Sequence, residues 1–229
     1  MKISIIVPVY NEESTVQDLL EQVRNVAIDD CTREIIVVDD GSTDGTRAIL
    51  ADVAHDNLVR VFYHERNRGK GAAVQTGLTK CTGDIIIIQD ADLEYDPQDF
   101  PRLLRPILSG KAKVVYGSRF LGEHKAMYFW HSVGNNFLTL VANVMFDTTL
   151  TDVETCYKVF TRDVATKLHL REPRWGFDPE ITCQILKSGC RIYEVPISYA
   201  GREYNEGKKI TWRDGFVVLW TLLRCRIRG

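Results

Sequence analysis

Apolar runs alternate with amphipathic segments through the first half of the chain. Short unbroken apolar runs predict buried strands at 3–9, 34–38, 58–63, 84–88 and 113–116. Segments with apolar residues at helical spacing lie between them and predict helices at 12–26, 69–80 and 97–108. A further helix is expected after the turn at 39–46, with Asp44 or Thr43 as its cap and an inner face of Ala48, Ile49 and Val53. Strands that alternate with helices favour right-handed βαβ units, and therefore a mostly parallel α/β sheet covered on both faces.

The pattern becomes irregular after Gly122. We expect an apolar helix at 129–146, short strands at 157–160 and 192–198, a polar loop at 202–209, and helices at 179–188 and 212–226. No repeat, low-complexity tract or linker separates this part from the first. The simplest interpretation is one domain over 1–229, with its later residues elaborating the sheet.

Composition narrows the class of protein. The chain has 229 residues, of which 45% are hydrophobic, enough for a full core, and its net charge of −2 argues against a general nucleic-acid binder. Six scattered cysteines without a CxxC pair are typical of reduced thiols in an intracellular protein. The first residues lack the layout of a signal peptide, so a cytoplasmic location is expected.

Two apolar segments raise the question of a membrane. Residues 126–146 carry no Asp, Glu, Lys or Arg but include three asparagines, which are costly in hydrocarbon, and 216–223 is too short to cross a bilayer. The stretch 208–228 has six basic residues against Asp214 and predicts a basic amphipathic helix suited to anionic headgroups. A terminal helix packed on the core, or a dimer face, is the alternative.

Acidic residues follow two of the predicted strands. Because parallel strands present their carboxyl ends at one edge, these residues are expected to gather where α/β sheets bind ligands. Asp39 and Asp40 beside Gly41 are equally typical of solvated turn acids. Asp90 and Asp92, one residue apart, offer the hard oxygen ligands that Mg²⁺ or Mn²⁺ prefers. Two such clusters together are a much more specific signal than either alone.

The ordered series of motifs resembles the inverting glycosyltransferases of family 2, and more narrowly the dolichyl-phosphate mannose/glucose synthases. The resemblance covers nearly the whole chain. It is carried by Val-Pro-Val-Tyr-Asn-Glu-Glu at 7–13, Val-Asp-Asp-Gly-Ser-Thr-Asp-Gly-Thr at 38–46, Gly-Lys-Gly at 69–71, Asp-Ala-Asp-Leu-Glu at 90–94, Gly-Ser-Arg-Phe at 117–120 and Glu-Val-Pro-Ile-Ser-Tyr at 194–199. It implies a GT-A fold: a Rossmann-like, mostly parallel sheet flanked by helices, with an acceptor-side elaboration and amphipathic helices. The half at 1–122 would bind the nucleotide sugar, and the half at 123–229 would face the acceptor and the membrane interface.

The resemblance also implies roles for individual residues. The nucleotide-sugar contacts would be Pro8, Tyr10, Glu12, Val38, Asp40, Asp90, Ala91 and Asp92. Asp90, Asp92 and Glu94 would hold Mg²⁺ or Mn²⁺, although a solvated turn acid is the alternative for Glu94. Arg119, Arg202 and Lys208 would meet the phosphates of donor and acceptor, and together with Asp92 they form the implied catalytic set. An exposed polar loop is the alternative for 202–209.

The implied reaction moves a hexose from a nucleotide sugar, of GDP-mannose or UDP-glucose type, to a polyprenyl phosphate such as dolichyl or undecaprenyl phosphate. A phosphate acceptor is already anionic, whereas a hydroxyl acceptor needs a general base. The candidates for such a base are Asp178 and Glu180, and helix capping is an equal explanation for Asp178. A family 2 enzyme with a hydroxyl acceptor and a non-catalytic nucleotide-sugar-binding scaffold are the alternatives. The expected location is the cytoplasmic membrane face, through peripheral contact or a membrane-protein partner, and a homo-oligomer is left open.

Overall fold

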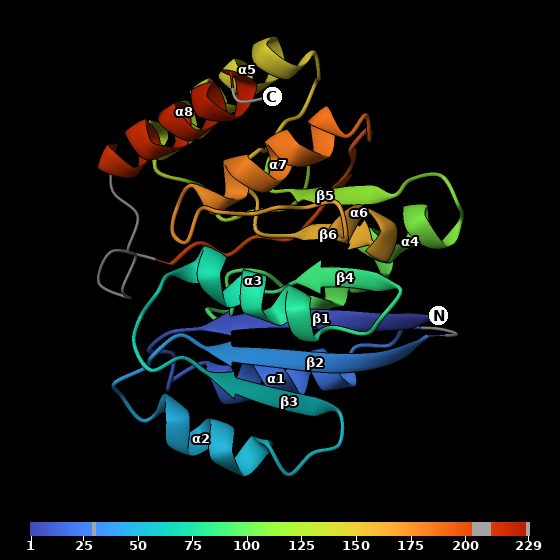
Figure 1. Cartoon of the computed structure of the whole chain (residues 1–229), viewed down its shortest axis with the longest axis vertical. Helices are drawn as coiled ribbons and strands as arrows, with labels where there is room; N and C mark the ends of the chain where they lie inside the picture. Colours follow the sequence, from blue (N-terminus) through green and yellow to red (C-terminus); the bar gives the residue numbers. More distant parts are fainter. Residues whose placement is uncertain (29–30, 203–211, 228–229) are drawn as a thin grey trace.

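A seven-stranded sheet with the order β3-β2-β1-β4-β6-β5-β7 forms the centre of this computed structural model, which describes residues 1–28, 31–202 and 212–227 (Figure 1). The strands are β1 Lys2–Val9, β2 Thr32–Asp39, β3 Val59–Tyr63, β4 Ile85–Ile88, β5 Val114–Ser118, β6 Lys158–Thr161 and β7 Tyr193–Pro196. The helices are α1 Val16–Asn25, α2 Thr46–Val53, α3 Lys70–Lys80, α4 Phe100–Leu108 after the short 3-10 helix η1 Pro97–Asp99, α5 Phe129–Phe146, α6 Arg162–Ala165, α7 Phe177–Lys187 and α8 Trp212–Ile227. The predicted α/β class is confirmed.

β6 is the exception to the parallel pattern. It runs antiparallel to both of its neighbours, with Val159 opposite Ile87 of β4 and also opposite Val115 of β5. β4 and β5 are therefore consecutive in the chain but not adjacent in the sheet. The short apolar run at 157–160 predicted a strand, but nothing in that run showed its direction or its place between two parallel strands.

The alternation of side chains along each strand builds two cores. Ile3, Ile5 and Val7 of β1 face α1, α2 and α4, whereas Ile6 faces the opposite side with α3, α6 and α7. Both faces of the central strands are apolar because helices cover both, as in other parallel sheets. Packing from two sides thus fixes the carboxyl edge of the sheet, where the candidate chemistry lies.

The start of α2 differs in detail from the expectation. The helix begins at Thr46, one residue after Gly45, and the side chain of Asp44 accepts a hydrogen bond from the backbone of Thr46. Leu50 is its buried apolar residue, whereas Ala48 is exposed, so the predicted inner face was wrong at that position. Asp44 also connects the start of α2 to the loop after β1, because its carboxylate accepts a second hydrogen bond from the backbone N–H of Glu13.

α5, α7 and α8 form a third, smaller core beyond the sheet. Leu138 and Ala142 of α5 meet Cys183 of α7 and Leu222 of α8, and Figure 1 shows α5 and α8 side by side at the end of the molecule opposite α2. Within the described residues, no helix combines the length and the apolar character needed to cross a membrane. The outer side of the pair nevertheless carries exposed apolar side chains, which we call the apolar surface: Phe129, Trp130, Val133, Phe137, Leu140 and Val144 of α5, with Phe216, Val217, Trp220, Leu223 and Ile227 of α8.

Glu34 joins three segments at the amino edge of the sheet. Its buried carboxylate accepts hydrogen bonds from Lys2 Nζ at 2.8 Å, Ser4 Oγ at 2.6 Å and the backbone N–H of Thr82 at 2.5 Å. Burial acts to raise the pKa of this carboxyl group, but these bonds outweigh it and lower the pKa to about 2. The contribution of Glu34 to stability is therefore present above its unfolded pKa near 4.5 and is lost as the pH falls towards 2.

We expect Glu34→Gln to reduce the free energy of unfolding at pH 7 by about 1–3 kcal/mol, because a buried amide then faces donors that it satisfies only in part. The difference from wild type should shrink at pH 3, and urea denaturation at both pH values measures it. Glu65→Gln changes an exposed carboxylate and is the matched control. Equal effects of the two substitutions would show that the Glu34 network does not stabilise the fold.

Candidate active site

Four loops meet at the carboxyl edge of the sheet, as the strand pattern predicts. Val9 and Asp39 end their strands side by side, and the backbone N–H of Asp40 donates to the carbonyl of Val9. The loop after β1 is tied to the loop after β2 by Asn11, which adopts φ 54° and accepts from the backbone of Thr43. Left-handed backbone is favourable for asparagine, so this residue type suits the turn. Pro8 and Val38 are register partners just behind this junction.

Asp39 and Asp40 are buried, so the interpretation as solvated turn acids was wrong. Asp40 accepts from the backbone N–H groups of Arg68 and Gly69, and its Oδ1 lies 2.7 Å from His64 Nδ1. Asp40 thereby holds the turn that begins α3. Gly69 has φ 100°, and a Cβ there would lie 2.3 Å from the carbonyl oxygen of Pro173, so the turn requires glycine. A contact between Asp40 and the nucleotide sugar stays a prediction.

Asp90, Ala91 and Asp92 follow β4 in a tight turn. Lys70 Nζ lies 2.8 Å from Asp90, and Leu93 adopts φ 59°, a strained conformation for leucine, while the backbone N–H of Glu94 donates to Asp92. Burial, and then the charges of Asp90 and Glu94, raise the pKa of Asp92 to about 7. Because its surroundings disfavour the anionic form of Asp92, a bound cation would stabilise that form.

Glu94 is not the solvated turn acid of the alternative interpretation. It accepts hydrogen bonds from the hydroxyl group of Tyr199 and the backbone N–H of Arg202, both at 2.8 Å. Among the described residues, no three His, Cys, Asp or Glu side chains already converge on a common metal position. The hard oxygen donors and the raised pKa of Asp92 fit a divalent cation at Asp90 and Asp92, with Glu94 close by in the same turn. The assignment of Glu94 as a ligand stays a prediction.

Arg202 and Glu12 meet although 190 residues separate them in the chain. Arg202 Nη2 donates to Glu12 Oε2 at 2.8 Å, Nη1 donates to Oε1 at 3.3 Å, and Nε donates to the backbone carbonyl of Asp92. Arg202, which is predicted to bind phosphate, thus lies beside Glu12 in the loop after β1 and beside the turn at 90–94, which we call the acidic turn. Tyr10 lies half-buried in that loop. Lys208 lies outside the described residues.

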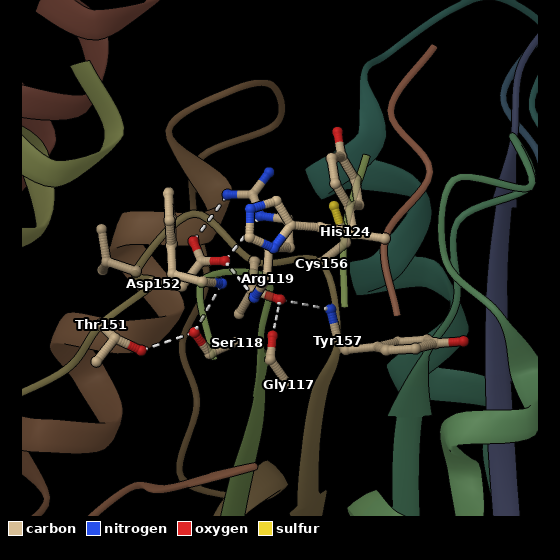
Figure 2. A network of polar contacts seen from close by, with 12 residues as sticks. Gly117, Ser118, Arg119, His124, Thr151, Asp152, Cys156 and Tyr157 are labelled. Carbon is tan, nitrogen blue, oxygen red and sulfur yellow. Dashed lines mark hydrogen bonds and ion pairs between the residues drawn. The ribbon is translucent and has the colours of Figure 1, made fainter. Parts of the chain in front are cut away.

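Figure 2 shows Arg119 joined to Asp152 in a two-pronged ion pair. Both bonds measure 2.7 Å, and the guanidinium group also lies over the ring of Tyr199. Burial alone would lower the pKa of Arg119, but the charge of Asp152 outweighs it and raises that pKa well above its ordinary value. Asp152 is absent from the sequence-based site because it lies in an irregular segment without periodicity.

A second buried network connects the acidic turn to α7. Asp178 lies 2.7 Å from Lys158 Nζ and 3.9 Å from Lys70 Nζ. Burial acts to raise the pKa of Asp178, but the charges of the two lysines outweigh it and lower the pKa below the ordinary value. The helix-capping interpretation was wrong, because α7 begins at Phe177 and Asp178 lies inside its first turn. Glu180 accepts from the backbone N–H groups of Arg171 and Glu172, and so holds the preceding loop.

The sequence of the chain matches a known protein family. The model of glycosyl transferase family 2 matches residues 4–168. A UDP-N-acetylglucosamine–dolichyl-phosphate N-acetylglucosaminyltransferase of Methanococcus voltae is 29% identical, over 98% of this chain and 96% of that protein. A dolichyl-phosphate β-glucosyltransferase of Trichomonas vaginalis is 30% identical, over 89% of this chain and 66% of that protein.

Among solved structures, the glucosyl-3-phosphoglycerate synthase of Mycobacterium tuberculosis, in complex with Mn²⁺, UDP and glucosyl-3-phosphoglycerate, has a similar fold. The TM-score is 0.75 at 21% identity, with 98% of this chain and 79% of that chain covered. Another structure of that enzyme contains Mg²⁺ and UDP. The expected GT-A fold is therefore confirmed.

We expect Asp152→Asn to lower the free energy of unfolding by about 3 kcal/mol, because it leaves the buried charge of Arg119 without its partner. Urea denaturation measures the change. Asp163→Asn breaks the ion pair with Lys113, which lies on the surface, and should have a much smaller effect. If both substitutions destabilise the protein equally, loss of Asp152 does not leave Arg119 as an uncompensated buried charge.

Proposed function

Because the chain belongs to glycosyl transferase family 2, we propose that this glycosyltransferase moves a hexose, of glucose, mannose or N-acetylglucosamine type, from a nucleoside-diphosphate sugar to a polyprenyl phosphate. Two relatives named for transfer to dolichyl phosphate match at least 89% of this chain and support this acceptor class. An attack on the face of the sugar opposite the leaving nucleotide would invert the anomeric centre.

The lowered pKa of Asp178 is the observation that favours a phosphate acceptor. A hydroxyl acceptor needs a base to remove its proton, and a carboxylate whose pKa is lowered by Lys158 and Lys70 is a weak base. Glu180, the other candidate, is occupied by two backbone N–H groups. A phosphate oxygen is already anionic near neutral pH and needs no such group. Neither Asp178 nor Glu180 is therefore suited to act as the base that a hydroxyl acceptor needs, and this favours a phosphate acceptor.

The donor would bind along the four loops at the carboxyl edge. Tyr10 lies in the first of these loops, and Pro8 and Val38 are register partners just behind the junction of the first two. Glu12 and Asp40 would supply carboxylates, and Ala91 would offer its backbone beside the acidic turn. Asp90, Asp92 and Glu94 would hold Mg²⁺ or Mn²⁺, which would stabilise the negative charge that develops on the departing nucleoside diphosphate. Lys70 already contacts Asp90 and would share that carboxylate.

Three cations are proposed for the phosphates of donor and acceptor: Arg119, Arg202 and Lys208. Arg202 lies beside the acidic turn through its bond to the carbonyl of Asp92. Its ion pair with Glu12 holds the guanidinium group there and would loosen as a phosphate oxygen competes for the same donors. Arg119 is buried, and Asp152 holds its Nε and Nη2, so its Nη1 would be the part of the guanidinium group left to meet a phosphate.

The apolar surface supplies a route to a lipid acceptor. Trp130 is 77% exposed and Trp220 is 66% exposed on neighbouring helices, a pattern typical of helices that lie in a membrane interface. The basic residues of the final segment would meet anionic headgroups. We therefore infer that the enzyme binds a membrane surface through α5 and α8.

We expect Asp92→Asn to reduce transfer at least about 100-fold, because it removes charge from the site where the leaving group is stabilised. The assay follows label from UDP-N-acetylglucosamine, UDP-glucose or GDP-mannose into dolichyl or undecaprenyl phosphate, with Mg²⁺ or Mn²⁺. Asp96→Asn changes an exposed carboxylate four residues away, at the start of η1, and should retain wild-type transfer. A wild-type enzyme that labels no lipid phosphate from any donor would refute the proposed acceptor, and near-normal turnover of the Asp92 variant would refute its role.

We expect Trp130→Ser with Trp220→Ser to weaken binding to vesicles of phosphatidylcholine and phosphatidylglycerol by at least about tenfold, since each ring would lose about 1.5–3 kcal/mol of apolar burial. Vesicle co-sedimentation measures the binding. Leu108→Ser changes an exposed apolar residue of α4 and serves as the matched control. An equal loss in both proteins would place the membrane contact elsewhere.

A further inference from the structure

The loop between α5 and β6 contains one carboxyl group without a partner. Three polar residues near it in the chain bond to the site: Asp152 to Arg119, Thr155 Oγ to the carbonyl of Gly117, and Cys156 Sγ to Lys70 Nζ. The side-chain atom Oε1 of Glu154 is shut off from solvent and has no hydrogen-bond partner in the described parts of the chain. Because buried polar atoms in native proteins are almost always paired, an orphan amid such a network requires an explanation.

The loop places Glu154 at the carboxyl edge of the sheet. β6 begins at Lys158, which lies opposite Tyr116 near the end of β5, and the residues before β6 therefore reach the same edge as the acidic turn. The carboxyl group lies within electrostatic range of Asp178, Lys158, Arg119 and Asp152. Asp178 approaches Lys70, and Lys70 contacts Asp90. Glu154 thus lies at the same edge of the sheet as the acidic turn, close to the ion pairs that connect this turn to α7.

The charges around Glu154 are already balanced. Lys158 is paired with Asp178, Arg119 with Asp152, and Lys70 with Asp90, so these pairs leave no cation to receive an additional anion at this position. Burial, and then the charge of Asp178, raise the pKa of Glu154 to about 8. Below that pH the group is a neutral carboxylic acid, which both donates and accepts hydrogen bonds. An uncharged hydroxyl group is the chemical class that matches it.

We propose that Glu154 is a specificity-determining residue that hydrogen-bonds a hydroxyl group of the sugar being transferred. The inference rests on the proposed nucleotide-sugar donor. A sugar attached to a diphosphate near Asp90 and Asp92 would lie at the same edge of the sheet as Glu154. The substrate is then the missing hydrogen-bond partner of Glu154. Glutamine should function in place of Glu154, because its amide group has the same shape and also donates and accepts hydrogen bonds.

The test is calorimetric binding of the donor that wild type uses, compared with binding of its nucleoside diphosphate alone. Glu154→Ala should weaken binding of the sugar nucleotide about tenfold, the value of one hydrogen bond, and leave binding of the nucleoside diphosphate unchanged. Glu154→Gln should bind both within about twofold of wild type. Glu123→Gln changes an exposed carboxylate and is the matched control. Thermal melts should show both Glu154 variants to be folded, since neither loses an existing hydrogen bond.

Deoxy-sugar analogues of the same donor identify the hydroxyl group. One analogue should bind wild type as weakly as the Glu154→Ala variant binds the full donor, and should bind both proteins equally. If Glu154→Ala weakens donor and nucleoside diphosphate alike, or neither, the inference is wrong. If Glu154→Gln binds normally but transfers as poorly as Glu154→Ala, Glu154 is a general base and the inference is also wrong. A wild-type protein that binds no nucleotide sugar would instead refute the proposed function.

Discussion

The ammonium group of Lys70 connects the parts of the site. It lies 2.8 Å from Asp90 after β4, 3.9 Å from Asp178 on α7 and 3.0 Å from the thiol of Cys156 before β6. Burial would favour the neutral amine, yet the surrounding negative groups outweigh it and raise the pKa of Lys70 well above its ordinary value. The positive charge of Lys70 therefore stabilises the close approach of three segments, two of which carry carboxylates that would otherwise repel each other. Its own position depends on Asp40, which fixes the turn at the start of α3.

The same principle of paired charges extends across the carboxyl edge. Arg119 with Asp152, Arg202 with Glu12, and Lys158 with Asp178 each cancel locally. Such pairs cost desolvation and add little net stability, so their value lies in orientation. Arginines held this way present fixed geometry to an incoming phosphate without a large reorganisation. A site of this kind would select the substrates that are able to break these ion pairs.

The acidic clusters could be located from the sequence because a general rule places them: parallel strands end at one edge, and Asp39, Asp40, Asp90 and Asp92 directly follow apolar runs. Asp152 and Glu154 could not be found in this way, because their loop has no periodicity and its position depends on the insertion of β6. The pairing of Glu12 with Arg202 was equally hidden, since each residue taken alone resembles a surface charge. Motif resemblance supplied candidate roles, but the partners of each charge emerged only from the tertiary structure.

The central position of β6 has a consequence for how the chain folds. When residues 1–118 have been synthesised, β4 and β5 each offer an inner edge that no other strand covers, and the strand that joins them follows about 40 residues later. Unpaired edges of apolar strands are templates for association with other chains. The nascent protein therefore passes through a period of exposure to aggregation that ends only when β6 emerges, and long-range closure of this type is slow. A fragment that ends before residue 158 would lack the means to complete its own sheet and would depend on chaperones to stay in solution.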